Sequence, residues 1–154
     1  MSPEDGESPQ QRQARRMAEL LQEVRVAQTG TQILFAFLLG VPFTQRFSEV
    51  TSFQQTVYFG TLLAAAVASA LLIAPSAYHR ILFRQKEKQF VIETSNVLII
   101  VGLAFVALAM SGVILLITDL LYNETTTAIV TAAIVLVFVV LWYVMPITRR
   151  IRET

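Results

Sequence analysis

Hydrophobic and polar positions are separated into blocks along the 154-residue chain: four long apolar stretches are joined by short polar connectors. A helix needs about 20 mostly apolar residues to cross the hydrocarbon core of a bilayer. The pattern therefore predicts membrane-spanning helices at about residues 26–43, 53–74, 96–121 and 126–145. The expected fold class is all-α, a polytopic membrane protein whose four transmembrane helices form a single domain over residues 12–154.

The segment before the first span divides into two parts. Residues 1–11 are rich in Pro, Gln, Ser and acidic residues and lack the basic start and apolar run of a signal peptide, so we expect a disordered tail that is not removed. From about Arg12, apolar residues recur every three or four positions, which predicts an amphipathic N-terminal helix. This helix either rests on the membrane or extends the first span into the cytoplasm, and the pattern is compatible with both.

Several helix ends carry recognisable signals. Thr51 followed three residues later by Gln54 has the form of a capping box and predicts the start of the second span. Pro75 is expected to close that span, and a short interfacial helix is expected within 76–89. Asn123 is expected to cap the fourth span.

A small-residue repeat lies inside the second span. Gly60, Ala64 and Ala68 follow one another at four-residue spacing, which would let another helix backbone approach closely. This repeat is interpreted as a packing face. The alternative, that alanine is simply a common helix former, is equally compatible with the pattern.

The basic residues predict the orientation. Eleven of the twelve flank one side of the expected spans, and Arg46 alone falls on the other. Short segments rich in Lys and Arg stay in the cytoplasm. The chain is therefore expected to be a multi-pass protein of the plasma membrane with both termini cytoplasmic. The eleven residues are Arg12, Arg15, Arg16, Arg25, Arg80, Arg84, Lys86, Lys88, Arg149, Arg150 and Arg152.

Composition supports a membrane protein and narrows the chemistry. The chain is 55% hydrophobic, which leaves too little polar surface for a soluble globule, and its formal net charge of +1 conceals the segregation of its basic residues. Cysteine is absent, which excludes disulfides, thiolate metal sites and cysteine nucleophiles.

Short motifs between residues 34 and 84 carry a family resemblance, namely LFAFLL at 34–39, VPF at 41–43, VYF at 57–59, IAPSAYHR at 73–80 and LFR at 82–84. The chain resembles a family of small four-helix integral membrane proteins, common in actinobacteria, that is grouped as a domain of unknown function. The resemblance covers roughly residues 20–150 and supplies no active-site residues. Some similar sequences are described as sodium/proton antiporters, so it also implies antiporter-like transport as an alternative.

Polar residues near the cytoplasmic ends of the first and third spans suggest a candidate site. They share one depth, where Glu93 is expected to be an interfacial charge that reaches water; the alternative hypothesis is an intramembrane polar cluster in which Arg25 pairs with Glu93 and fixes the register of the two helices. An ion carrier would place a carboxylate deep in the bilayer, whereas Glu93 and Asp119 are expected near opposite interfaces. The cluster consists of Arg25, Gln28, Gln32, Glu93 and Asn96.

A basic stripe forms the second candidate site. Arg80, Arg84 and Lys88 recur at four-residue spacing, and each side chain near an anionic leaflet contributes about 1 kcal/mol of attraction. The stripe either binds anionic lipid headgroups or only enforces topology. Nucleic-acid binding is not expected, because no aromatic residues are interleaved to stack on bases.

No pattern in the chain indicates catalysis. His79 is the only histidine, no Ser/His/Asp arrangement or phosphate-binding glycine loop is present, and no set of ligands has metal spacing. We therefore expect no enzyme activity, no metal and no cofactor.

Three functions remain. The first is a non-enzymatic structural or accessory component that forms a homo-oligomer or joins a larger membrane complex. The second is a small ion-coupled transporter acting through Glu93 or Asp119. The third is a membrane regulator that responds to anionic lipids of the cytoplasmic leaflet.

Overall fold

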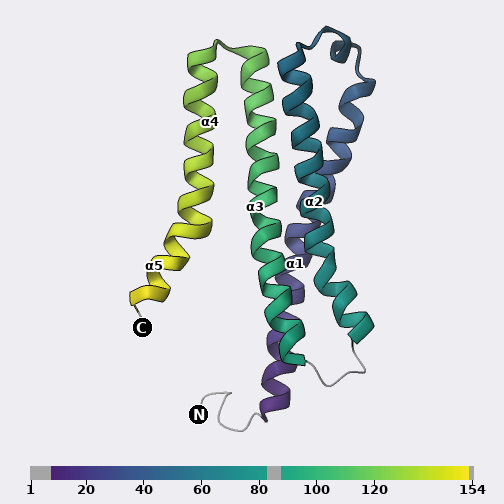
Figure 1. The fold of residues 1–154 in the computed structure, drawn as a ribbon, viewed down its shortest axis with the longest axis vertical. Coiled ribbons are helices and arrows are strands. Elements are labelled where there is room, and N and C mark those ends of the chain that lie inside the picture. The colour runs from purple at the N-terminus through teal and green to yellow at the C-terminus, as the bar shows by residue number, and fades with distance from the viewer. Residues whose placement is uncertain (1–7, 83–87, 153–154) are drawn as a thin grey trace.

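The computed structural model of the chain describes residues 8–82 and 88–152, nearly all of which lie in helices (Figure 1). Two turns of 3-10 helix and one π-helical turn interrupt the α-helices. The elements in chain order are α1 (Pro9–Gly40), 3-10 turns at Val41–Phe43 and Gln45–Glu49, α2 (Ser52–Leu82), α3 (Lys88–Leu121), α4 (Glu124–Val139), a π-helical turn (Val140–Val144) and α5 (Met145–Arg152).

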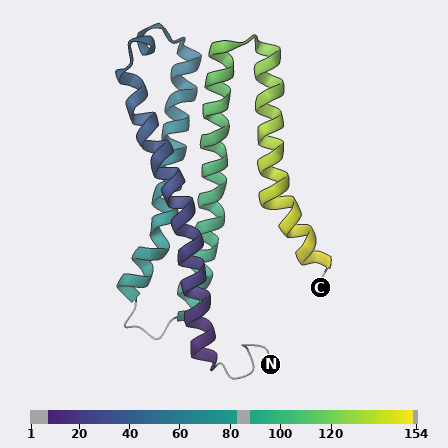
Figure 2. The same ribbon diagram turned by 180° about the vertical axis from the view of Figure 1, so that it is seen from behind.

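Four apolar segments within these helices are long enough to cross a membrane, namely Val24–Phe43, Ser52–Tyr78, Glu93–Leu121 and Glu124–Arg149. The prediction of an all-α polytopic membrane protein is therefore confirmed. The helices run up and down in chain order, so the start of α1 and the end of α5 lie at the same end of the molecule (Figures 1 and 2). We call this the terminal end. The opposite end, which contains residues 41–51 and 122–123, is the connector end.

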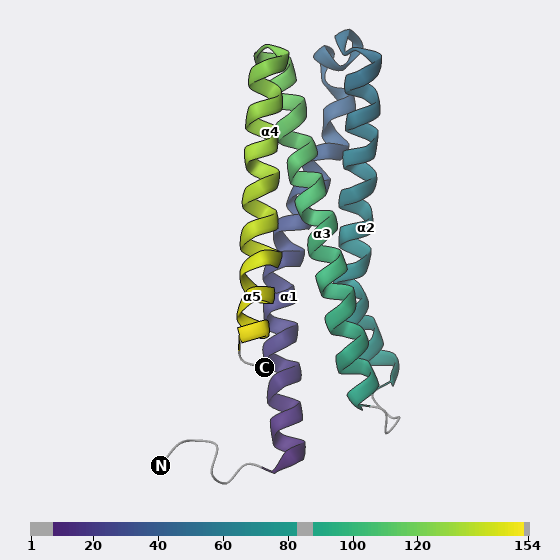
Figure 3. The same cartoon turned by 60° about the vertical axis from the view of Figure 1, so that its left-hand side comes forward.

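α1 joins the amphipathic lead-in and the first span in one continuous helix. It begins at Pro9 rather than at about Arg12, because Ser8 and Gln11 form a capping box: the Gln11 N–H donates to Ser8 Oγ over 3.3 Å, and the Ser8 N–H donates to Gln11 Oε1 over 2.8 Å. Figure 3 shows α1 projecting past the ends of the other helices. The lead-in thus extends the first span.

α2 continues through Pro75 to Leu82, so the prediction that this proline ends the second span is wrong. Pro75 has no N–H to donate to the Leu71 carbonyl. Membrane helices tolerate proline when neighbouring helices supply hydrogen bonds to the disturbed turn. Here the Gln28 side chain of α1 donates to the adjacent Leu72 carbonyl over 2.6 Å.

The buried face of α2, whose residues follow a heptad pattern, lies at the centre of the molecule. Residues spaced seven positions apart form two rows along one face of α2, and all six are buried. The first row is Tyr58, Ala65 and Leu72, and the second is Thr61, Ala68 and Pro75. Heptad spacing is the signature of antiparallel or parallel helices that pack at a shallow angle. This face packs mainly against α3.

Two glycines of α3 allow the close packing. A Cβ atom at Gly102 would lie 3.0 Å from Leu72 Cδ2, and one at Gly112 would collide with the Thr61 side chain. Ala64 and Ala68 are buried as predicted, but Gly60 is exposed with open space around it, so its place in the predicted packing face is wrong. The heptad register turns this residue away from α3.

α4 is the least embedded of the four spanning helices. Among the described elements, it packs against α3 and continues into the π-helical turn, and Thr127 is its buried residue. The π-helical turn precedes Pro146, and there the Met145 N–H donates to the Val140 carbonyl. The helix changes direction at this turn and α5 leads away from the other helices (Figure 1).

Candidate functional site

The predicted polar cluster lies on α1 and α3 toward the terminal end. Gln28 is half-buried, and its amide turns to Leu72 of α2 rather than to α3. The other four residues are exposed, namely Arg25, Gln32, Glu93 and Asn96. The grouping of these five side chains into one unit stays a prediction.

Gln32 belongs to a polar and small-residue stripe that we call the α1 outer face. Its members recur every three or four residues on one side of α1 and all are exposed. The Thr29 hydroxyl donates to the Arg25 carbonyl over 3.0 Å, whereas the described part of the chain offers the Gln32 amide no hydrogen bond. The stripe consists of Arg25, Thr29, Gln32, Ala36 and Gly40.

The described members of the basic stripe lie at the terminal end, where α2 ends and α3 begins. Arg80 is exposed near the end of α2. Arg84 lies outside the described residues. Lys88 is the first residue of α3, but its side chain, like that of His79, is outside the described part of the structure. Lipid binding by this stripe stays a prediction.

At the connector end, a capping box is linked to a distant carboxylate. As predicted, Thr51 and Gln54 start α2: the Gln54 N–H donates to Thr51 Oγ1 over 3.2 Å, and the Thr51 N–H donates to Gln54 Oε1 over 3.0 Å. The remaining Gln54 amide nitrogen donates to Asp119 Oδ2 of α3 over 2.8 Å. The cap therefore orients an amide that joins the ends of two helices.

A second interhelical hydrogen bond lies deeper at this end. Pro42 cannot donate to the carbonyl of Leu38, four residues earlier, and the Val41 N–H donates to that carbonyl instead, which leaves it a second lone pair. The Tyr58 hydroxyl of α2 donates to it over 2.8 Å. The Tyr58 ring also makes an edge contact with Phe47, with ring centroids 5.1 Å apart. α1, the connector and α2 are thereby fixed to one another.

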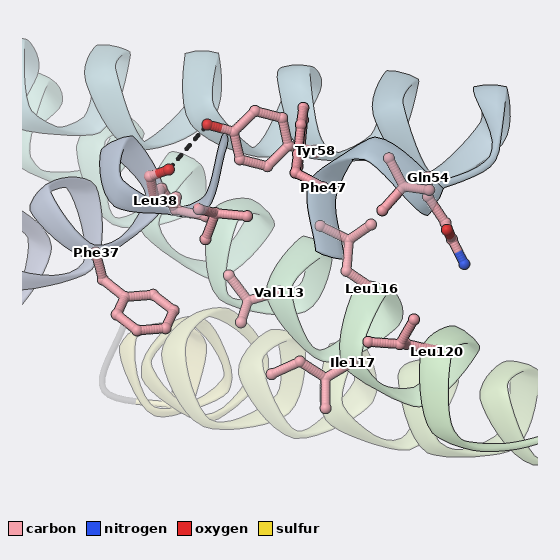
Figure 4. Close-up of a pocket in the computed structure, with 11 residues that line it drawn as sticks. Phe37, Leu38, Phe47, Gln54, Tyr58, Val113, Leu116, Ile117 and Leu120 are labelled. Atoms are coloured by element: carbon pink, nitrogen blue, oxygen red, sulfur yellow. Dashed lines mark hydrogen bonds between the residues drawn. The ribbon is translucent and has the colours of Figure 1, made fainter. Parts of the chain in front are cut away.

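Beside these bonds lies an apolar pocket of about 160 Å³, formed by the ends of α1, α2 and α3 and the connector (Figure 4). Leu38 and Tyr58 are buried beneath it, while Phe37 and Ile117 are largely exposed at its edge. Figure 4 shows the Gln54 amide directed away from the pocket. Its surface is almost entirely hydrocarbon.

The connector-end site was missed by sequence reasoning, although two of its signals were visible. The capping box and the position of Asp119 near a helix end could be identified, but the hydrogen bond between residues 54 and 119 depends on helix packing. Within the described residues, no three His, Cys, Asp or Glu side chains gather as a metal site would require. The arrangement is suited to binding apolar groups and to fixing helices.

Comparison with known proteins gives a family but no function. A family model described as "Family of unknown function (DUF6328)" matches residues 6–146. No curated protein and no solved structure matches the chain.

Proposed function

Since the chain belongs to the DUF6328 family, whose function is unknown, we propose from its structure that it is a non-enzymatic structural or accessory component of a membrane assembly. It binds a partner helix along the α1 outer face. The partner is a second copy of the chain or a helix of another membrane protein.

The position of Gln32 carries this proposal. Gln32 lies within the span Val24–Phe43, one helical turn, or about 6 Å, deeper than Gln28. Placing an amide in hydrocarbon without a hydrogen bond costs free energy of order 2–7 kcal/mol. A partner helix offers the missing donor or acceptor, as polar side chains do across packed membrane helices.

The rest of the α1 outer face suits a close helix contact. Ala36 and Gly40 continue the stripe beyond Gln32, and a Cβ atom at Gly40 would meet open space. Small residues let two backbones approach, which favours van der Waals contact and short hydrogen bonds in lipid. The face therefore combines a polar group that needs a partner with a surface that admits one.

The charge distribution supports the plasma membrane with both termini cytoplasmic. The terminal end holds the exposed Arg12, Arg15, Arg80 and Arg149, whereas the connector end exposes Glu49 and Glu124. The positive-inside rule assigns the basic end to the cytoplasm. The anionic lipids of that leaflet are the expected neighbours of the basic residues.

Ion transport receives less support. Glu93 and Asp119 begin and nearly end the third span, about 39 Å apart along α3 at 1.5 Å per residue. Neither lies midway through the bilayer, and the carboxylate of Asp119 accepts a hydrogen bond from Gln54. This spacing favours the accessory role over a proton or sodium relay.

The test is co-purification at native expression level from a mild detergent, with the wild-type chain compared with Gln32→Leu. We expect a defined assembly, either a homo-oligomer or a stoichiometric complex, that Gln32→Leu weakens. An interhelical hydrogen bond in lipid is worth about 0.6–2 kcal/mol, so the expected loss of affinity is about threefold to thirtyfold.

The matched control is Ile33→Leu, an exposed neighbour that keeps an apolar side chain. It should leave the assembly unchanged. Recovery of both the wild type and Gln32→Leu as monomers without any partner would overturn the proposal.

A further inference from the structure

The apolar pocket at the connector end does not take part in the proposed helix contact and has its own chemistry. It lies on the side of α1 that contacts α2, away from Gln32, and it extends along α3 from Val113 to Leu120. With the third span ending at Leu121, the pocket reaches about 12 Å into the bilayer. It is therefore embedded in one leaflet.

The polar atoms close to the pocket are already engaged with the protein. The Tyr58 hydroxyl donates to the Leu38 carbonyl, and the Gln54 amide is bonded to Thr51 and Asp119. What these residues present to the pocket is ring and methylene surface. Water in such a site would lack the two to four polar partners that it needs.

The edge of the pocket opens sideways to the hydrocarbon. Phe37 of α1 is 66% exposed and Ile117 of α3 is 47% exposed, while Tyr58 between them is 8% exposed. An apolar cavity of about 150 Å³ is large enough for a benzene ring, so this one admits a segment of hydrocarbon chain. An empty pocket would forfeit the dispersion contacts of its lining.

A more polar hollow continues the pocket toward the aqueous phase. The two share Val41, Phe47, Val50 and Leu120. The outer hollow is also lined by Thr44, Gln45 and Glu49 of the connector. An apolar slot followed by a polar mouth at the membrane surface has the polarity profile of an amphiphile.

We propose that this pocket is a lipid site, in which one acyl chain of a phospholipid from the leaflet at the connector end lies between Phe37 and Ile117. Its glycerol and headgroup lie at the Thr44, Gln45 and Glu49 mouth. The bound chain completes the packing of α1 against α3, which diverge toward this end (Figure 2).

The test uses the full chain in vesicles of phosphatidylglycerol and phosphatidylethanolamine that contain a small fraction of the same lipids with a diazirine in the acyl chain. After illumination, mass spectrometry of peptides locates the adducts. We expect several-fold more adduct on the pocket residues Phe37 and Ile117 than on Leu108, which is 59% exposed on α3 outside the pocket.

Two filling variants and a matched control sharpen the result. Val113→Phe places a ring in the pocket and should reduce the adducts at Phe37 and Ile117 several-fold, and Leu116→Phe should do the same if the first variant fails to fold. Val101→Phe adds the same ring on the exposed side of α3 and should leave them unchanged.

Two results would overturn the proposal. Adduct yields could follow exposure alone, with no enrichment at the pocket. They could persist unchanged in both folded filling variants.

Discussion

α1 and α4 are the two outer helices, and each packs against one side of the central α2–α3 pair. The exposed side of α4 is apolar, with Ile129 65% exposed and Leu136 62% exposed. The exposed side of α1 instead contains Thr29 and Gln32 within its span. Both helices have an exposed side, but only α4 has the apolar surface expected of a helix that contacts lipid alone.

This difference separates two meanings of exposure in a membrane protein. An exposed apolar side chain is favourably solvated by lipid tails and requires no protein partner. An exposed amide in the span remains unfavourable until another group hydrogen-bonds to it. The comparison is therefore the reason why we propose a protein contact for the α1 outer face and not for α4.

The largest expected effect comes from blocking the α1 outer face. Ala36→Phe should weaken the assembly by about 1–3 kcal/mol, the usual cost of overpacking, or roughly fivefold to 150-fold. The same substitution at Ala133, which is exposed on α4, should leave the assembly intact. Native mass spectrometry from mild detergent measures both. Equal weakening by the two variants would erase the distinction between the helices.

Substitutions at Gln28 and Gln32 should separate effects on folding from effects on assembly. Gln28→Leu removes the donor to the Leu72 carbonyl and should lower the free energy of unfolding by about 1–2 kcal/mol. Gln32→Leu removes an exposed amide and should change that free energy by less than about 0.5 kcal/mol. Unfolding in mixed micelles of dodecylmaltoside and sodium dodecyl sulfate measures both values. A larger loss for Gln32→Leu would place its partner within the monomer.

Tyr58 and Tyr143 each make a hydrogen bond between an outer helix and its neighbour, so removing each hydroxyl shows how firmly α1 and α4 are held. Tyr58→Phe removes the 2.8 Å hydrogen bond between α2 and the buried Leu38 carbonyl, which keeps the Val41 N–H as a donor, and should cost about 1 kcal/mol. Tyr143 makes a longer, exposed bond of 3.2 Å to the Ile100 carbonyl of α3, so Tyr143→Phe should cost less than about 0.5 kcal/mol. The same unfolding assay applies, and the reverse order would show that α4 is the more firmly held helix.

Pro42 supplies an independent control on the Tyr58 bond. Pro42→Ala adds an N–H that can donate to the Leu38 carbonyl beside the N–H of Val41, so the tyrosine hydroxyl becomes less important. The cost of Tyr58→Phe should therefore fall in the Pro42→Ala background. An undiminished cost in the double-mutant cycle would mean that the hydroxyl acts through some other contact.

The smallest expected effect lies in the seam between α3 and α4. Thr127 is 5% exposed, and its hydroxyl oxygen has no hydrogen-bond partner. Thr127→Val keeps the shape and removes this group, so we expect a change between zero and a stabilisation of about 1 kcal/mol. Destabilisation in the unfolding assay would reveal a hydrogen bond that joins α4 more tightly than the fold indicates.

The spans and caps could be predicted from the sequence because they depend on local properties. Apolar length locates a membrane helix, and Thr51 with Gln54, like Asn123, caps a helix through residues three positions apart. Pro75 was misjudged because it is buried among packed helices, where Gln28 of another helix donates to the adjacent Leu72 carbonyl. A rule about proline in an isolated helix contains no information about that neighbour.

The candidate sites were harder to predict for the same reason. Gln28 and Gln32 are alike in the sequence, yet only the packed fold gives one of them a partner. Gln54 and Asp119 are distant in the chain and meet only because α2 and α3 pack in a particular register. The pocket needs three helices and a connector at once, so no periodicity indicates it.

The most direct test of the central claim is a photo-crosslinking scan with benzoylphenylalanine along both outer helices in native membranes. The account predicts discrete protein adducts at Thr29, Ala36 and Gly40, with a helical period, and only lipid adducts at Ile129 and Leu136. Protein adducts that were absent from α1, or that followed α4 instead, would contradict it.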